Sequence, residues 1–208
     1  CTLVRKRHDQ FQIELDNGER YFFSKAMFQE RPLMPEEEVD EQELDHWVLL
    51  RQYRPALEKA VAMLAARPCS QGEIEKKLRT IGCSEETISM VITKLVRENL
   101  INDREFSQQW AVSRTNQKYG PHRIAQELKA KGVVQEDIQA AIDQLPEGDQ
   151  LNHAISLAAR GLSRAKPNED LHKSLRRTLS MLVRKGYSWE TAKEACHLAL
   201  KLLQEEAE

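Results

Sequence analysis

The feature that most constrains the fold of this 208-residue chain is an internal repeat. Residues 74–95, "IEKKLRTIGCSEETISMVITKL", align without a gap with residues 124–145, "IAQELKAKGVVQEDIQAAIDQL", at an offset of fifty. Apolar positions coincide along the two segments, and Gly82 falls opposite Gly132. A weaker third copy around Gly186 follows at a further offset of fifty-four. Self-similarity at a fixed period indicates small supersecondary units that bury their apolar faces by stacking on one another.

Each copy has the pattern of two short helices separated by a glycine turn. Pro121 suits the first position of a helix, where its fixed φ helps and its missing N–H is no loss. Gly132 can adopt the left-handed conformation that ends a helix, and the acidic residues after Gln135 suit the first turn of the next helix. We therefore expect positive φ angles at Gly132 and at its equivalents, Gly82 and Gly186.

A further helix precedes each pair. The spacing of apolar residues predicts these helices within residues 55–67, 103–118 and 149–162. In the first of them we expect Leu57, Val61 and Leu64 to form one buried face. Ser70, followed three residues later by Glu73, predicts a capping box at the start of the next helix.

The predicted fold class is mainly α. Three tandem three-helix units, each resembling a helix-turn-helix, are expected to stack into an elongated body behind a small β extension. The few glycines and the 31% of charged residues agree with exposed helices. The expected domains are a β extension at 1–30, an acidic linker and helix at 31–53, and repeats at 54–102, 103–147 and 148–208.

The N-terminal extension has the pattern of three short strands. They are expected at residues 2–7, 10–15 and 20–23, and Asn17-Gly18 between the last two is a strong hairpin signal. A three-stranded piece this small needs support from a helix or a partner.

Charge is distributed unevenly along the chain, although the formal net charge is only −2. Residues 1–53 carry 7 Lys and Arg against 12 Asp and Glu, whereas residues 54–208 carry 24 against 21. The acidic N-terminal part and mildly basic helical part favour an anionic partner for the helices.

Several functional classes have no support in the sequence. It contains no Walker A loop, GxSxG or HExxH motif, and its six histidines are scattered, so neither catalysis nor a cofactor is expected. No apolar run approaches a membrane span, and the absence of a CxxC pattern favours a reducing cytoplasm. Because the chain starts at Cys1 rather than at a methionine, we expect a trimmed or truncated N-terminus. The four cysteines are Cys1, Cys69, Cys83 and Cys196.

Basic residues recur on the middle helix of each unit. Several occupy equivalent positions in the repeats, which predicts an interrupted basic track for a polyanion or an acidic protein groove. Solvated helix faces would give the same pattern, so that alternative stays open. The three tryptophans, Trp47, Trp110 and Trp189, are expected to be packing anchors. The candidate binding residues are Lys76, Lys77, Arg79, Arg123, Lys129, Lys131, Arg176, Arg177, Arg184 and Lys185.

Two segments resemble the signature blocks of a known family. Residues 67–110, "RPCSQGEIEKKLRTIGCSEETISMVITKLVRENLINDREFSQQW", and residues 119–132, "YGPHRIAQELKAKG", are similar to the RecX family of bacterial regulators that inhibit the RecA recombinase. The resemblance is strong over residues 55–145, weaker over 146–203, and reaches the β extension only in outline. It implies an elongated array of three-helix repeats that lies in the groove of the RecA filament on single-stranded DNA.

The resemblance also implies a mode of action. Such a protein restrains filament growth, ATP hydrolysis and strand exchange, binds DNA directly but more weakly, and has no enzymatic activity. The third unit departs from the pattern, with Thr178 at its first apolar position and residues 166–170, "KPNED", where the second has "YGP". By position, the contacts to filament and DNA would come from Arg79, Arg123, Lys129, Arg176 and Arg177.

Three functional hypotheses follow. The first is a monomeric, cytoplasmic, non-enzymatic regulator whose partners are the RecA filament and, more weakly, single-stranded or duplex DNA, with no membrane association. The second is a sequence-specific transcriptional regulator that reads DNA with one helix-turn-helix unit. The third is a pure protein-interaction scaffold on which the basic residues only confer solubility.

Overall fold

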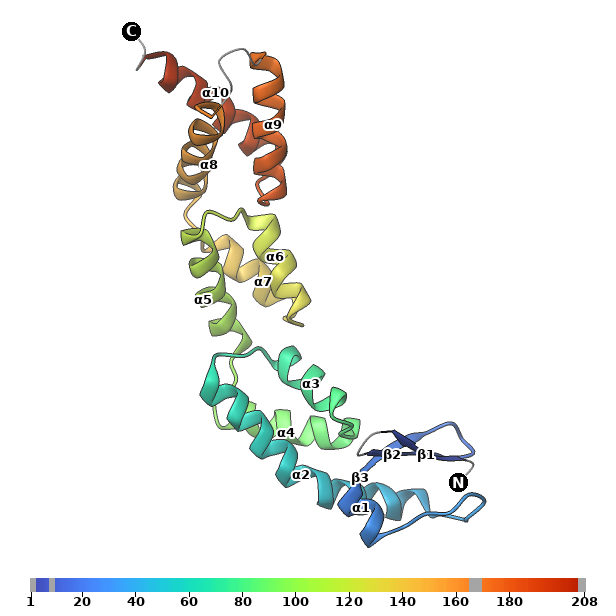
Figure 1. Ribbon diagram of the computed structural model, residues 1–208. Coiled ribbons are helices and arrows are strands. Elements are labelled where there is room, and N and C mark those ends of the chain that lie inside the picture. The colour runs from blue at the N-terminus through green and yellow to red at the C-terminus, as the bar shows by residue number, and fades with distance from the viewer. Residues whose placement is uncertain (1–2, 8–9, 165–169, 206–208) are drawn as a thin grey trace. The chain divides into compact units, whose positions relative to one another are not determined.

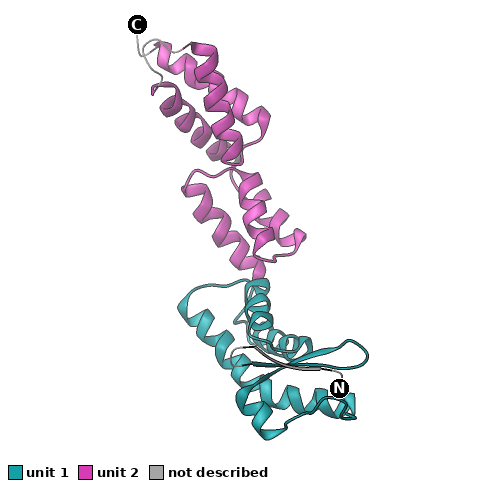
Figure 2. Cartoon of the chain, turned by 45° about the vertical axis from the view of Figure 1, so that its right-hand side comes forward, with its two compact units in different colours: residues 1–102 teal, residues 103–208 magenta. Residues whose placement is uncertain are grey.

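The computed structural model describes residues 3–7, 10–164 and 170–205. Thr2 of the first predicted strand, Cys1 and residues 166–169 of "KPNED" lie outside these ranges. The chain forms two compact units, residues 1–102 and residues 103–208 (Figure 2).

The N-terminal sheet is antiparallel with the strand order β1-β2-β3. It consists of β1 (Leu3–Arg7), β2 (Gln10–Glu14) and β3 (Arg20–Ser24). The predicted hairpin at Asn17-Gly18 is confirmed, since Gly18 has a φ of 87° and its N–H donates to the Leu15 carbonyl at 3.0 Å. Ile13 and Phe23 pack in a core that α1 (Lys25–Glu30) and the first half of α2 (Glu41–Ala66) complete.

Helix α2 corrects one boundary that the sequence suggested. The expected division between residues 53 and 54 falls inside this helix, which continues unbroken through Pro55. A proline inside a helix removes a hydrogen bond and disfavours the helical conformation before it. Packing outweighs this penalty, because Leu44 and Val48 are buried in the core of the sheet while Ala56 and Ala60 are buried in the core of the first repeat.

Two predicted buried positions are wrong. Val61 on α2 is 43% exposed, because the helix instead turns its small residues Ala56 and Ala60 toward the core. Trp189 is 59% exposed and is therefore no packing anchor. Trp47 does pack, with its ring centroid 5.3 Å from that of Phe23.

Together with the second half of α2, the remaining helices form three groups of three, each around its own core (Figure 1). The equivalent residues Leu78, Leu128 and Leu182 are fully buried, one in each core. The predicted fold class of tandem three-helix units behind a β extension is confirmed. Repeat 1 comprises the second half of α2, α3 (Gln71–Thr80) and α4 (Glu85–Arg97). Repeat 2 comprises α5 (Asp103–Asn116), α6 (Pro121–Ala130) and α7 (Gln135–Asp143). Repeat 3 comprises α8 (Glu147–Leu162), α9 (Leu171–Arg184) and α10 (Trp189–Glu205).

The glycine turns have the predicted geometry. Gly82, Gly132 and Gly186 have φ angles of 86°, 80° and 96°. In each turn the N–H after the glycine donates to the carbonyl five residues earlier, as from Val133 to Leu128 at 3.2 Å. This bond ends the first helix and directs the chain into the second.

The start of α3 also agrees with the sequence. Ser70 and Glu73 form the predicted capping box, in which each side chain accepts the other's backbone N–H. Repeat 1 is further tied to the sheet by the buried amide of Gln52. That amide donates to the carbonyls of Phe22 and Gly82, at 3.2 and 3.1 Å, and accepts from the Ser84 N–H at 2.7 Å.

Repeat 3 tolerates a polar residue at its first core position. Thr178 is 2% exposed on α9, and its side chain fits because the facing residue on α8 is Gly161, whose added Cβ would lie 3.0 Å from it. The hydroxyls of Thr178 and of Ser174 one turn earlier have no hydrogen-bond partner within the described part of the chain. Unpaired buried hydroxyls destabilise a core, so the interface between α8 and α9 is less stable than an all-apolar one.

Candidate interaction surface at the junction of repeats 2 and 3

Repeats 2 and 3 meet through backbone atoms. The N–H of Gly120 donates to the Lys185 carbonyl at 2.9 Å, and the N–H of His122 donates to the Gly186 carbonyl at 3.0 Å. A side chain at Gly120 would overlap the backbone of Gly186 and Tyr187. The Gly-Pro pair before α6 therefore has two roles, since Pro121 starts the helix and Gly120 lets the glycine turn of the next repeat approach it.

Side chains reinforce this junction. The buried Tyr187 hydroxyl donates to the Lys118 carbonyl at 3.2 Å, and burial raises the pKa of Tyr187 to about 12. The Lys118 ammonium donates to the Ser156 hydroxyl at 2.7 Å. The two repeats are thus held in one arrangement by contacts from several elements.

Aromatic rings and cations gather at the same place. The Tyr119 ring has the Arg123 guanidinium 4.3 Å, the Lys185 ammonium 4.6 Å and the Arg114 guanidinium 5.8 Å from its centroid. Such distances allow each cation to interact with the negative face of the ring. Trp110 similarly has Arg114 at 4.4 Å and the Lys131 ammonium at 4.1 Å. We call this group the junction cluster; it consists of Trp110, Arg114, Tyr119, Arg123, Glu127, Lys131 and Lys185.

A single carboxylate organises the cluster. Glu127 accepts from Arg114 Nε at 2.7 Å, from Arg123 Nε at 3.2 Å and from Trp110 Nε1 at 3.2 Å. Two of the four cations pair with this acid, and the other two, Lys131 and Lys185, lie over the aromatic rings, so the cluster has a formal charge of +3. Like charges held this close attract anions, and their aromatic partners supply surface on which planar groups can stack.

A hollow of about 320 Å³ opens beside the cluster, between α6 and the end of α9. Arg123 and Arg184 both line it, and Val183 and Ala130 supply apolar wall. Arg184 is exposed, and no carboxylate of the described residues forms an ion pair with it. We call this feature the junction hollow; its lining residues are His122, Arg123, Gln126, Glu127, Ala130, Val183, Arg184 and Gly186.

The ten cations predicted from the sequence do not all belong to this surface. Arg123, Lys131 and Lys185 meet in the junction cluster, and Arg184 lines the hollow. The others are exposed on their own helices, and their role in binding stays a prediction: Lys76, Lys77 and Arg79 on α3, Lys129 on α6, and Arg176 and Arg177 on α9.

Arg79 forms an ion pair within its own repeat. Its Nε donates to Glu85 at 2.6 Å, and this guanidinium lowers the pKa of the Glu85 carboxyl. Both side chains are exposed, so the pair contributes little to stability and remains open to exchange with a partner.

Sequence reasoning missed three members of the cluster, Arg114, Tyr119 and Glu127. The spacing of Arg123 and Glu127, four residues apart in one helix, is a local signal that could have identified that pair. No local pattern could have placed Lys185 against Tyr119, because they belong to different repeats. Trp110 does pack as expected, beside Phe106 with ring centroids 5.9 Å apart, but it is also a hydrogen-bond donor in the cluster.

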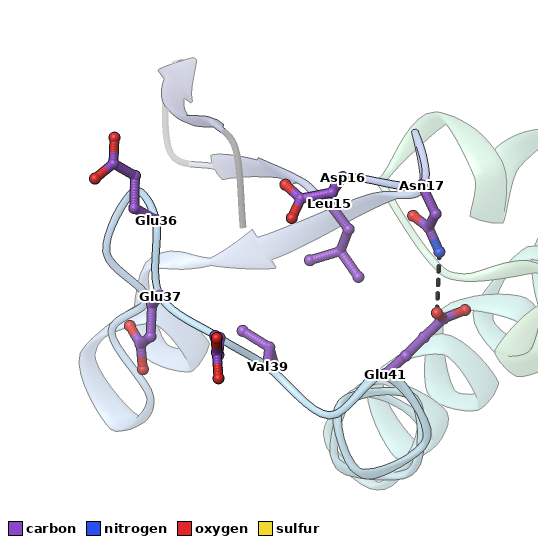
Figure 3. Close-up of a pocket in the computed structure, with 8 residues that line it drawn as sticks. Leu15, Asp16, Asn17, Glu36, Glu37, Val39 and Glu41 are labelled. Atoms are coloured by element: carbon purple, nitrogen blue, oxygen red, sulfur yellow. Dashed lines mark hydrogen bonds between the residues drawn. The ribbon is translucent and has the colours of Figure 1, made fainter.

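The N-terminal unit presents a hollow of the opposite charge. It has a volume of about 660 Å³ and lies between the β2–β3 turn and the segment that leads into α2 (Figure 3). Asn17 Nδ2 donates to Glu41 Oε2 at 2.9 Å across it, and the nearby charge of Glu19 raises the pKa of Glu41. In the described ranges no three His, Cys, Asp or Glu side chains are placed to hold a metal ion. The other lining residues are Leu15, Asp16, Glu36, Glu37, Glu38 and Val39.

No helix within the described ranges combines the length and apolar character that a bilayer span requires.

Comparison with known proteins gives one consistent result. Family models described as the first and second three-helix domains of RecX match residues 56–95 and 102–142. A regulatory protein RecX from Bacillus cereus (strain G9842) is 30% identical over 212 residues, which cover 98% of this chain and 76% of the relative. The chain belongs to the RecX family of regulatory proteins.

Two solved structures share the fold. One is a crystal structure of regulatory protein RecX, with a TM-score of 0.63 and 24% identity, covering 91% of this chain and 95% of the other. The second, RecX from Lactobacillus salivarius, has a TM-score of 0.66 and 22% identity, covering 72% of this chain and 97% of the other. The tandem three-helix architecture described above is therefore the architecture of solved RecX proteins, and this chain is a member of that family in sequence and in fold.

Proposed function

We propose that this protein is a non-enzymatic regulator that binds RecA filaments on single-stranded DNA. In this role it restrains ATP hydrolysis, filament extension and strand exchange, and it binds DNA directly with lower affinity. It acts as a monomer in the cytoplasm. Membership in a family of regulatory proteins supports the proposal, and the observation that carries it is the junction cluster, a preorganised cationic surface shared by two repeats.

The geometry of the cluster suits a large anionic partner. Because backbone hydrogen bonds fix repeat 2 against repeat 3, Arg123 and Lys185 are presented together and need little ordering on binding. Binding energy is lost when flexible cations must be immobilised, so a preformed cationic surface gains affinity from its rigidity. The exposed cations of α6 and α9 extend the contact beyond the cluster, and those of α3 are candidate contacts of the first unit.

The last helices of repeats 1 and 2, each the second helix of its helix-turn-helix pair, do not favour a transcription factor. In a helix-turn-helix protein that helix enters the major groove and contacts bases and phosphates. Here α4 begins with Glu85 and Glu86, and α7 carries Glu136 and Asp137 in its first turn. Acids at that position repel the phosphate backbone.

The test is RecA-type ATP hydrolysis on single-stranded DNA while the protein is titrated well below the recombinase concentration. We expect loss of hydrolysis at substoichiometric protein, since simple competition for DNA would need far more. Direct DNA binding is measured in parallel at two salt concentrations and should weaken as salt rises. Unaffected hydrolysis together with tight, sequence-selective duplex binding would refute the proposal in favour of transcriptional control.

A pair of charge reversals tests the surface itself. Arg123→Glu with Lys129→Glu should weaken inhibition while the fold stays intact. The matched control reverses the charge of two exposed cations that also belong to residues 103–208 but lie outside the candidate surface, Arg160→Glu with Lys193→Glu. Unchanged inhibition by the first variant would remove the cationic surface of α6 from the proposal.

A further inference from the structure

The junction hollow is lined by two arginines, and only one of them forms an ion pair with a carboxylate of the described residues. Arg123 on one side is held by Glu127 at 3.2 Å, whereas Arg184 on the other is exposed and pairs with none of the carboxylates in the described ranges. The two arginines come from different repeats, and neither repeat alone would form the hollow. The site is therefore a product of the contact between Gly120 and Gly186.

We propose that the junction hollow receives an Asp or Glu side chain of the partner protein, with Arg184 as its main contact. This assignment rests on the proposed function and names the chemistry by which one part of the surface recognises the protein component of the filament. A guanidinium presents a planar fork of N–H donors that matches the two oxygens of a carboxylate.

The size of the hollow suits a side chain. A volume of about 320 Å³ is at the lower end of the range of protein ligand sites, roughly 300–1,000 Å³. It accommodates one acidic side chain with part of the backbone that carries it, but no whole helix. The amide of Gln126 and the ring of His122 can donate further hydrogen bonds there.

The lining favours a protein carboxylate over a phosphodiester. Val183, 41% exposed, and Ala130 provide apolar surface that the aliphatic part of a peptide would cover. A nucleic-acid backbone needs a row of cations at each successive phosphate, and here the row is interrupted by the carboxylate of Glu127. The hollow therefore offers room for one anion between Arg123 and Arg184, with apolar residues beside it. This combination is typical of the binding of an acidic side chain in a protein interface.

The adjacent junction cluster already holds one carboxylate through arginine N–H donors. Glu127 takes hydrogen bonds from two arginine Nε atoms and from Trp110. Its side chain is 23% exposed, so the junction cluster stabilises a partly buried acid with three donors. Arg184 offers a second acid the same type of donor on the opposite wall.

The experiment compares two affinities for each variant of the full chain. Fluorescence anisotropy measures binding to a RecA-type filament assembled on single-stranded DNA and, separately, to that DNA alone. We expect Arg184→Ala to weaken filament binding about tenfold and to leave binding to the free DNA unchanged. Arg184→Lys keeps the positive charge but loses the planar pair of N–H donors, so its affinity for the filament should lie between those of wild type and Arg184→Ala.

Arg160→Ala is the matched control, because Arg160 is an exposed arginine of the same repeat outside the hollow. Circular dichroism and the thermal midpoint check that each variant folds. Equal losses of filament and DNA affinity in Arg184→Ala would mean that the hollow takes a phosphodiester, which overturns the assignment. Equal affinities in Arg184→Ala and wild type would overturn it as well. Failure of the wild type itself to bind the filament would instead reject the proposed function.

Discussion

Replacing Gly120 with alanine should weaken the contact between repeats 2 and 3. Its φ of −81° is ordinary for alanine, so the substitution introduces no backbone strain. The added Cβ would overlap the carbonyl group of Gly186 and the nitrogen of Tyr187. These are backbone atoms, which no change of side-chain rotamer can move aside, and the two repeats must therefore separate.

The magnitude follows from the hydrogen bonds that separation breaks. The bonds from Gly120 to Lys185 and from His122 to Gly186 are 2.9 and 3.0 Å long, and the Tyr187 hydroxyl makes a third at 3.2 Å. Each of the three contributes about 0.5–1.5 kcal/mol net, so we expect the free energy of unfolding to fall by ~1.5–4.5 kcal/mol.

The assay is urea denaturation of the full chain, combined with native-state hydrogen exchange. In Gly120→Ala the His122 amide should exchange faster, because its acceptor has moved away. Gly148→Ala is the control, since a Cβ there meets no described atom within 4 Å and alanine in a helix should leave stability unchanged or raise it by up to about 1 kcal/mol. A Gly120→Ala protein as stable as wild type, with the His122 amide still protected, would refute the close approach of the two turns.

Four further results are expected. Gly132→Val should lower the free energy of unfolding by about 1–2 kcal/mol because valine is strained at a φ of 80°, and no loss in a urea titration would contradict the left-handed cap. Gln52→Leu should cost ~2–4 kcal/mol in the same titration, since three hydrogen bonds of a buried amide are lost. Glu127→Gln should tighten binding to single-stranded DNA at low salt by about fivefold, because it removes the only acid of the junction cluster, and unchanged anisotropy would locate DNA binding elsewhere. Because burial raises the pKa of Tyr187 to about 12, the stability that its neutral hydroxyl contributes is complete below pH about 10 and is lost as the pH rises from there toward 12. Tyr187→Phe should therefore reduce the fall in the free energy of unfolding over that range. Wild-type and Tyr187→Phe profiles that run parallel would exclude a contribution from Tyr187 ionisation.

Local signals account for the parts of the fold that the sequence predicted. The glycine turns, the helix start at Pro121 and the hairpin at Gly18 each depend on the backbone preference of one residue type. The capping box of Ser70 and Glu73 depends on two side chains three residues apart. Such signals act within a few residues, so a single sequence is enough to identify them.

The features that the sequence did not predict depend on contacts between distant residues. Pro55 suggests the start of a helix, yet α2 passes through it because its two halves are buried in two different cores. Lys185 and Tyr119 meet only because Gly120 allows two repeats to approach through their backbones. Trp189 is exposed although large aromatic residues are usually buried, and the structure offers no packing reason for it.

The proline in α2 has a consequence for where the N-terminal unit could be cut into two parts. Pro55 has no N–H to donate to the carbonyl of Arg51, so α2 lacks one backbone hydrogen bond at this point. The residues before it pack against the sheet, and those after it pack in repeat 1. A chain cut there would leave Pro55 in the first turn of the remaining helix, where proline is well tolerated. The residue that α2 tolerates at its middle is thus also one that suits the first turn of a helix, so a fragment that begins at Pro55 would keep a favourable start for the first helix of repeat 1.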